Sequence, residues 1–146
     1  MIRMLLFFIV LSLAAVRDLK DRIIPDGLVI LLMAVSVIPP GTIHPEGLLA
    51  ALPLFVTGVM AGGIGGGDIK LTGACGLVLG FARTTAGLLV GLFALISFHA
   101  VRSVIAEIAD RSKSRVKYGT TGKGQAYPFV PFLLFGMCVS FLTGAG

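Results

Sequence analysis

Gly65-Gly66-Gly67-Asp68-Ile69-Lys70 is a glycine run that leads directly into an apolar segment and places a carboxylate and an amine at its start. A charged pair at the edge of a lipid phase is energetically unfavourable, so its presence calls for a function. The glycines permit positive φ angles and a close approach of backbone or substrate. Lys70 stands in the first turn of the predicted helix, where the helix dipole disfavours a cation. This stretch is therefore the first candidate for a functional site.

The composition around this stretch is typical of a membrane protein. The chain has 146 residues, of which 56% are hydrophobic and 13% are charged, and its mean hydropathy is +1.01. A soluble domain carries roughly 25% charged residues. The length predicts one membrane-embedded domain over residues 1–146, with no separate soluble module.

Six apolar segments predict an all-α, polytopic bundle of about six transmembrane helices. The segments lie at about 2–16, 27–40, 46–63, 69–82, 84–105 and 127–144. Several are shorter than the ~20 residues needed to cross ~30 Å of hydrocarbon. The first and the fourth are short and adjoin acidic residues, so their polar ends are expected within the membrane interface.

A second acidic cluster, Asp18-Leu19-Lys20-Asp21-Arg22-Ile23-Ile24-Pro25-Asp26, follows the first apolar segment. The basic residues are more numerous after this segment than before it, which predicts that the N-terminus faces outward and that the segment is a retained helix rather than a cleaved signal. A basic loop predicted at 106–126 agrees with this orientation. Alternating the remaining segments places Asp18 and Asp68 on the same, cytoplasmic side.

Each acidic residue also has a purely structural interpretation. Asp68 and Asp26 each precede an apolar run and can act as helix N-caps, and we accept this interpretation for Asp26. Asp18 and Asp21 can be solvated partners of neighbouring basic residues. For Asp68 a site is favoured, because Ser, Thr or Asn would cap the helix without a charge near lipid. Lys70 is then expected to hold a neighbouring group or to tune the Asp68 carboxylate.

Three motifs together resemble the type IV prepilin peptidases, over essentially the whole chain. Gly65-Gly66-Gly67-Asp68 fits a GxGD motif that continues to Lys70 as in GDxKL. Asp18 stands seven residues before Pro25-Asp26, as in the family's other acidic motif. The stretch 127–133, Tyr-Pro-Phe-Val-Pro-Phe-Leu, resembles the proline-rich start of the family's last helix. Signal-peptide-peptidase and presenilin-type enzymes pair GxGD with a Tyr-Asp motif, whereas here Arg17 precedes Asp18.

The resemblance implies a catalytic pair, Asp18 and Asp68. Its supporting motif residues are Gly65, Gly67, Lys70 and Pro25. Asp21 matches no catalytic position. In such a pair the two carboxylates share a proton, one activates water, and the other polarises the scissile carbonyl. The helix dipole and Lys70 favour an ionised Asp68, so Asp18 is expected to be the protonated partner.

The resemblance further implies an aspartic-type endopeptidase that hydrolyses the leader of type IV prepilins or pseudopilins. Its site is expected at the cytoplasmic face of the inner or plasma membrane, and its partners are these substrates and the lipid bilayer. No metal, organic cofactor or nucleic acid is expected.

Longer family members carry an N-terminal portion with CxxC motifs and a methyl-transfer activity. Cys75 and Cys138 form no CxxC pattern, so the chain resembles the short form of the tight-adherence (Flp) pilus systems, and methyl transfer is not expected. Two other functions remain open. One is a small transporter or channel subunit with Asp18 and Asp68 as ion sites. The other is a non-catalytic pilus-assembly adaptor in which the aspartates act only as caps.

Overall fold

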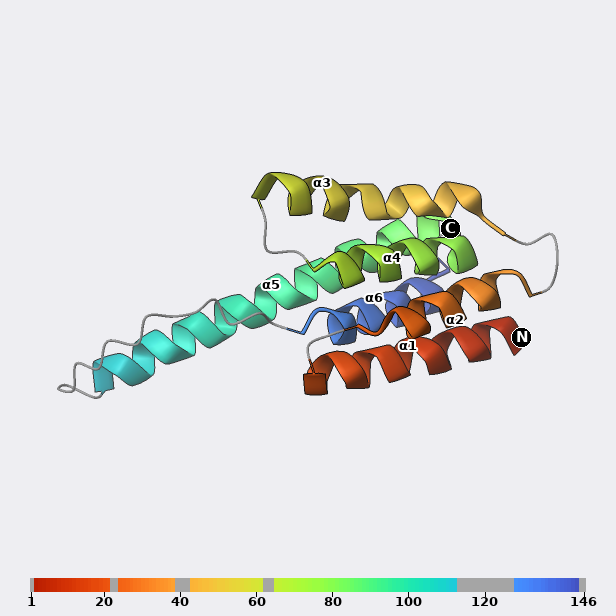
Figure 1. The fold of residues 1–146 in the computed structure, drawn as a ribbon. Coiled ribbons are helices and arrows are strands. Elements are labelled where there is room, and N and C mark those ends of the chain that lie inside the picture. Colours follow the sequence, from red (N-terminus) through yellow and green to blue (C-terminus); the bar gives the residue numbers. More distant parts are fainter. Residues whose placement is uncertain (1, 22–23, 39–42, 62–64, 113–127, 145–146) are drawn as a thin grey trace.

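The computed structural model describes residues 2–21, 24–38, 43–61, 65–112 and 128–144 (Figure 1). All regular structure in these ranges is helical, which confirms the predicted all-α class. The elements are α1 (Ile2–Asp21), α2 (Asp26–Ser36), the 3-10 helix η1 (Pro45–Ala51), α3 (Leu52–Ala61), α4 (Gly66–Leu79), α5 (Phe81–Ser112) and α6 (Val130–Leu142). Because η1 runs directly into α3, the six predicted apolar segments correspond to six helical rods.

The helices lie side by side and alternate in direction (Figure 1). At one end of the bundle α1 and α3 finish and α2, α4 and α6 begin; we call this the aspartate end, because Asp18 and Asp68 lie on α1 and α4 there. At the other end α1, η1 and α5 begin; we call it the arginine end, after Arg3 and Arg83. α5 continues past the other helices beyond the aspartate end (Figure 1).

Glycines allow two pairs of helices to pack with their backbones in contact. Gly136 of α6 lies against the backbone of Gly87 in α5, and Gly47 of η1 lies against Gly76 of α4. Neither pair leaves space for a Cβ atom. Small residues at helix interfaces are a common way to pack helices closely where lipid supplies no hydrophobic driving force.

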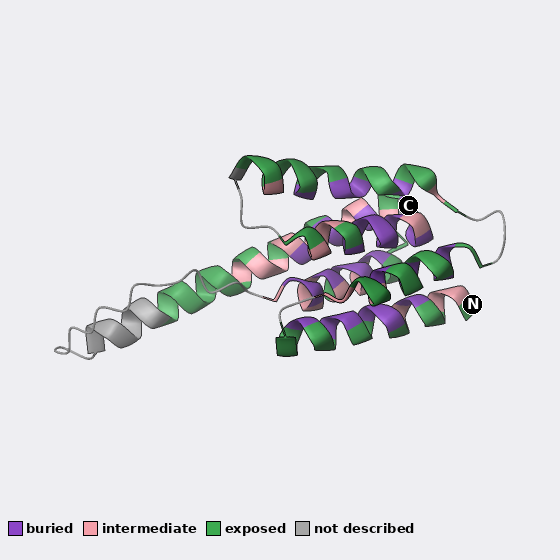
Figure 2. Cartoon of the chain, viewed as in Figure 1, coloured by how far each residue is buried: buried purple, intermediate pink, exposed green. Residues whose placement is uncertain are grey.

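Among the described residues, the core is a single cluster of apolar side chains to which all six α-helices, α1 to α6, contribute. Phe7, Leu32, Leu71 and Leu133 are each fully buried in it. Figure 2 shows buried residues on the sides of the helices that face one another and exposed residues on the outward sides.

Many of the outward side chains are large and apolar, which is not the amphipathic pattern of a soluble bundle. Phe93 on α5, for example, is 75% exposed. Among the residues described, one helix, Phe81–Ile105, is long and apolar enough to cross a membrane on its own. Three shorter apolar helices accompany it: Asp26–Ser36, Pro45–Met60 and Val130–Leu142.

Several predicted boundaries were wrong. Residues 17–21 were expected in a loop, but they form the last turn of α1, which is therefore not one of the short helices. The predicted loop at 106–126 is helical as far as Ser112. The rest of that loop, and the parts of predicted segments at 39–40, 62–63 and 127, lie outside the described residues.

Candidate active site

Asp18 is buried at the aspartate end although it is a charged residue. It lies in the last turn of α1, is 6% exposed, and its Oδ2 accepts a 2.9 Å hydrogen bond from the backbone N–H of Val130. Val130 is the first residue of α6, and the N-cap residue Phe129 provides no side-chain cap. The first N–H groups of a helix have no partner within the helix. Asp18 therefore supplies a missing acceptor from another helix and lies at the positive end of the α6 dipole.

Asp68 is half-buried in the first turn of α4. The N-cap position of this helix belongs to Gly65, so the N-cap interpretation of Asp68 was wrong. The backbone N–H of Asp68 donates to the Gly65 carbonyl at 3.0 Å. A Cβ atom built on Gly65 would lie 3.4 Å from Asp68 Oδ2, so the carboxylate folds back over the glycine turn.

The fold brings Asp18 and Asp68 together from motifs that lie far apart in the sequence. Both are at the aspartate end, and the charge of Asp18 acts on the Asp68 carboxylate. Two nearby carboxylates resist simultaneous ionisation. Such a pair can hold one proton between its members, with one acting as acid and the other as base.

Lys70 does not contact Asp68. Its Nζ donates instead to Asp26 Oδ1 of α2 at 3.0 Å, with both side chains mostly exposed. Residues two positions apart on a helix do not share a face, which separates Lys70 from Asp68. Of the two roles expected for Lys70, this contact fits the holding of a neighbouring group, Asp26, and not a contact with the Asp68 carboxylate. The N-cap interpretation of Asp26 was wrong, because Pro25 holds that position and Asp26 follows it.

The Lys70–Asp26 ion pair joins the two acidic motifs rather than the two candidate catalytic residues. Pro25 starts α2 by accepting the N–H of Leu28 at 3.0 Å. The pair therefore ties the beginning of α2, which follows Asp18 in sequence, to the first turn of α4. Exposed ion pairs contribute only about 0–1 kcal/mol to stability, so its role is one of orientation more than of stability.

The glycine run acts through space and not through unusual backbone angles. Positive φ angles occur among the described glycines at Gly80 and Gly144, and not at 65–67. A Cβ atom on Gly67 would lie 3.1 Å from the Cβ of Ile24, so Gly67 lets the start of α4 approach the linker before α2. The glycines at 65–67 therefore do not use the positive φ angles that they permit. The close approach at Gly67 is to the Ile24 side chain rather than to backbone or substrate.

Asp21 stays outside the site, as predicted. Its Oδ2 lies 3.7 Å from Arg17 Nη1 one turn earlier on α1, and both side chains are exposed. Sequence reasoning missed Val130, because a backbone donor leaves no side-chain signal. The proline-rich stretch at the start of α6 was the available clue.

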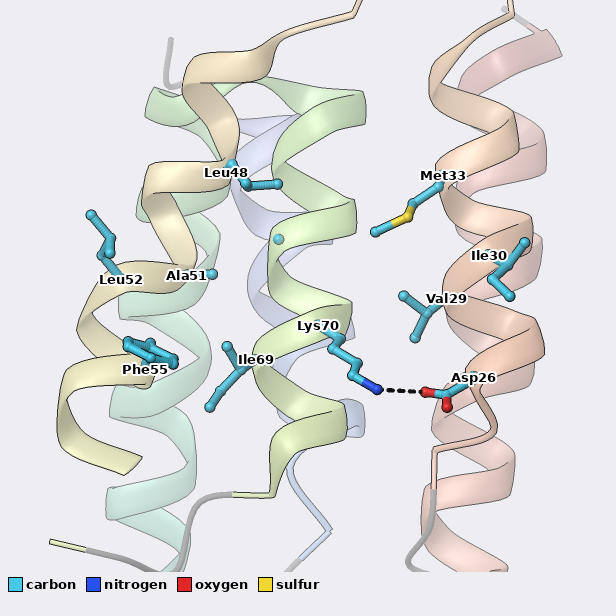
Figure 3. Close-up of a pocket in the computed structure, with 11 residues that line it drawn as sticks. Asp26, Val29, Ile30, Met33, Leu48, Ala51, Leu52, Phe55, Ile69 and Lys70 are labelled. Atoms are coloured by element: carbon cyan, nitrogen blue, oxygen red, sulfur yellow. Dashed lines mark hydrogen bonds and ion pairs between the residues drawn. The ribbon is translucent and has the colours of Figure 1, made fainter. Parts of the chain in front are cut away.

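An apolar groove lies on another side of α4, between α2 and the η1–α3 rod (Figure 3). Its volume is about 560 Å³, and side chains such as Met33, Phe55 and Ile69 line it. The Lys70–Asp26 pair stands at one end of it (Figure 3). In the described part of the chain, no three His, Cys, Asp or Glu side chains gather in a way that would hold a metal ion.

The family assignment agrees with this arrangement. The type IV leader peptidase family matches residues 5–103, more than half of the chain. This range includes Asp18 and Asp68 and ends before α6. The chain belongs to this family.

One curated relative is the prepilin leader peptidase/N-methyltransferase of Bacillus subtilis (strain 168). It is 29% identical over 147 residues, which cover 94% of this chain and 54% of the relative. The chain thus spans about half the length of the curated relative that it matches. No solved structure matches the chain significantly.

Proposed function

We propose that this chain is a prepilin leader peptidase of the aspartic type, in which Asp18 and Asp68 form the catalytic pair. The observation that carries the proposal is the placement of two motif carboxylates at one end of the bundle, Asp18 in the last turn of α1 and Asp68 in the first turn of α4. Family membership supports a peptidase, and the site contains the two groups that water activation and carbonyl polarisation require.

The contacts of the two aspartates favour Asp18 as the ionised member. Its carboxylate accepts the Val130 N–H and faces the amino end of α6, and both interactions stabilise a negative charge. Lys70, the cation expected to stabilise Asp68, is paired with Asp26. This assignment reverses the one expected from the sequence.

The reaction then follows from general acid–base chemistry. Asp18 removes a proton from a water molecule, whose oxygen attacks the scissile carbonyl carbon. Asp68 donates its proton to the carbonyl oxygen. Collapse of the resulting tetrahedral diol breaks the C–N bond: protonated Asp18 gives its proton to the leaving nitrogen, and ionised Asp68 takes the proton of a diol hydroxyl as the carbonyl of the new carboxyl group forms. The two aspartates return to a state with one shared proton, so no covalent intermediate with the protein forms.

We place the site at the cytoplasmic face of the inner or plasma membrane, in a single multi-pass domain with its N-terminus outside. The outward apolar side chains and the long apolar helix Phe81–Ile105 support membrane insertion. The basic residues Arg17 and Lys20 at the end of α1 support the orientation, because basic flanks remain cytoplasmic. Short helices such as α2 are compatible with local thinning of the bilayer.

The substrates proposed are type IV prepilins or pseudopilins, whose leader would be cut at the aspartate end. The test is cleavage of a co-expressed prepilin from the same genome, followed by a gel shift in membranes. Asp18→Asn and Asp68→Asn are expected to abolish cleavage at unchanged protein level, whereas Asp21→Asn retains it. Retained cleavage in Asp68→Asn would contradict the aspartyl mechanism. That result would favour the non-catalytic adaptor. Loss of an ion-linked flux in both variants, with prepilin processing unchanged, would favour the transporter.

A further inference from the structure

Two arginines from different helices line one pocket at the arginine end, away from the aspartates. Arg3 lies in the first turn of α1 and Arg83 in the first turn of α5, and the pocket that they share has a volume of about 520 Å³. His44 and Glu46 also line it, as does the apolar side chain of Phe81. The proposed peptidase reaction uses none of these residues.

Local structure holds both arginines at this pocket. Arg3 Nη2 donates a 3.0 Å hydrogen bond to the carbonyl of Val78, near the carboxyl end of α4. Gly80 has a φ of 85° and is the one residue between α4 and α5, so α5 begins immediately beside that end. The Ser140 hydroxyl of α6 donates to the Arg83 carbonyl at 2.9 Å, which fixes the backbone at Arg83.

The charges that line the pocket favour an anion. Among the described residues that line it, the one carboxylate is that of Glu46, which lies 3.0 Å from His44 Nδ1 and so has a local partner. No side chain in the described ranges pairs with the Arg83 guanidinium. The first N–H groups of α5, which lack partners within the helix, add positive potential at the same place. The hydrogen bond to α4 gives Arg3 a structural role, whereas the Arg83 guanidinium has no such contact in the described ranges.

Phosphate and carboxylate are the anionic groups whose oxygens match a guanidinium, because its planar fork donates two parallel hydrogen bonds. The pocket also has apolar walls from Met4, Leu79 and Phe81, which a free ion would not need. We propose that this pocket binds the phosphate of an anionic phospholipid headgroup, with Arg83 as its main ligand. The site is thus a lipid site on the face opposite the peptidase site.

The test is native mass spectrometry of the purified full chain, titrated with phosphatidylglycerol or with phosphatidylcholine. Wild type is expected to retain phosphatidylglycerol in preference to phosphatidylcholine. Arg83→Gln is expected to weaken this binding by roughly tenfold, the change that loss of one charge-assisted contact brings. Arg83→Lys keeps the charge but loses the fork, and is expected to lie between the two. Lys20→Gln removes the same charge at the aspartate end and should bind as wild type does.

Equal retention of the two lipids by wild type would overturn the proposal. So would an equal loss of phosphatidylglycerol affinity in Arg83→Gln and Lys20→Gln. If millimolar inorganic phosphate displaces the lipid in the presence of Arg83 but not in Arg83→Gln, free phosphate and not a lipid headgroup is the ligand of the pocket. Correct folding of each variant is checked by protection of the buried Cys75 thiol from a maleimide dye. The readout is binding, so its outcome is independent of whether the chain cleaves prepilins.

Discussion

The Asp18 carboxylate accepts a 2.9 Å hydrogen bond from the backbone N–H of Val130, a residue 112 positions later in the chain. This contact links the first helix to the last and puts a buried carboxylate at the amino end of α6. It gives α6 a direct part in the proposed reaction, because a donor that stabilises the ionised carboxylate also holds it in position. Removal of this hydrogen bond should therefore lower the rate of the proposed reaction.

Replacing Val130 with proline removes the N–H at the first position of a helix, where proline is favoured. It also disfavours the αR backbone of Phe129, the residue before it. Loss of a hydrogen bond to a charged group costs about 1.5–3 kcal/mol, which corresponds to roughly a 10- to 100-fold lower kcat. KM should change little, because the contact is not made with substrate. Both constants are measured with purified enzyme and a synthetic prepilin peptide.

The matched control is Val130→Ala, which keeps the N–H and loses only apolar packing of a fully buried side chain. It should lower the melting temperature while leaving kcat within a few-fold of wild type. If the proline and alanine variants lose activity equally, Val130 acts through packing and not through its N–H.

Lys70→Gln is expected to reduce cleavage only several-fold. The reason is that Lys70 contacts Asp26 in an exposed pair rather than the Asp68 carboxylate, and such pairs contribute about 0–1 kcal/mol. The exchange Lys70→Asp with Asp26→Lys restores the pair in reverse and should recover part of the loss. A Lys70→Gln variant as inactive as Asp68→Asn would place the amine in the chemistry itself.

Gly136→Ala is expected to destabilise the bundle, because the new methyl group would meet the backbone of Gly87 in α5. Overpacking of this kind costs roughly 1–3 kcal/mol. Gly27→Ala on α2 is the control, since a Cβ there has nothing within 4 Å and alanine favours the helix. Thermal melting followed through exposure of Cys75 measures both. If Gly136→Ala melts at the same temperature as Gly27→Ala, the α5–α6 interface accommodates the methyl group without loss of stability.

The proposed orientation makes a prediction for membrane-impermeant maleimides on intact cells. Glu46→Cys, at the arginine end, is expected to react from outside. Lys20→Cys, at the aspartate end, is expected to react only after the membrane is opened. Both side chains are exposed, so accessibility reflects sidedness and not burial. The reverse labelling pattern would place the candidate active site outside the cytoplasm.

Much of the architecture could be predicted from the sequence. Apolar periodicity and composition indicate an all-α chain, and the alternation of six segments correctly predicts that Asp18 and Asp68 lie at one end. The motif residues also indicate the family. These features depend on local pattern and on chain direction, both of which are present in the sequence itself.

The partners of the polar groups could not be predicted in the same way. Lys70 was expected to act near Asp68, its neighbour in sequence, but helical geometry turns it toward Asp26 on α2. The donor to Asp18 is a backbone N–H whose position depends on how α6 packs against α1. The arginine-end pocket likewise depends on the tight turn at Gly80. Each of these contacts is fixed by tertiary packing.

The most direct test of the central claim compares the single variants Asp18→Asn and Asp68→Asn with the double variant, using purified enzyme and one prepilin substrate. Residues that act as one catalytic unit are not additive. Each single substitution is therefore expected to abolish cleavage, and the double variant should be no worse than either. Losses that are partial and multiply in the double variant, or an Asp68→Asn enzyme with wild-type kcat, would contradict an Asp18–Asp68 catalytic pair.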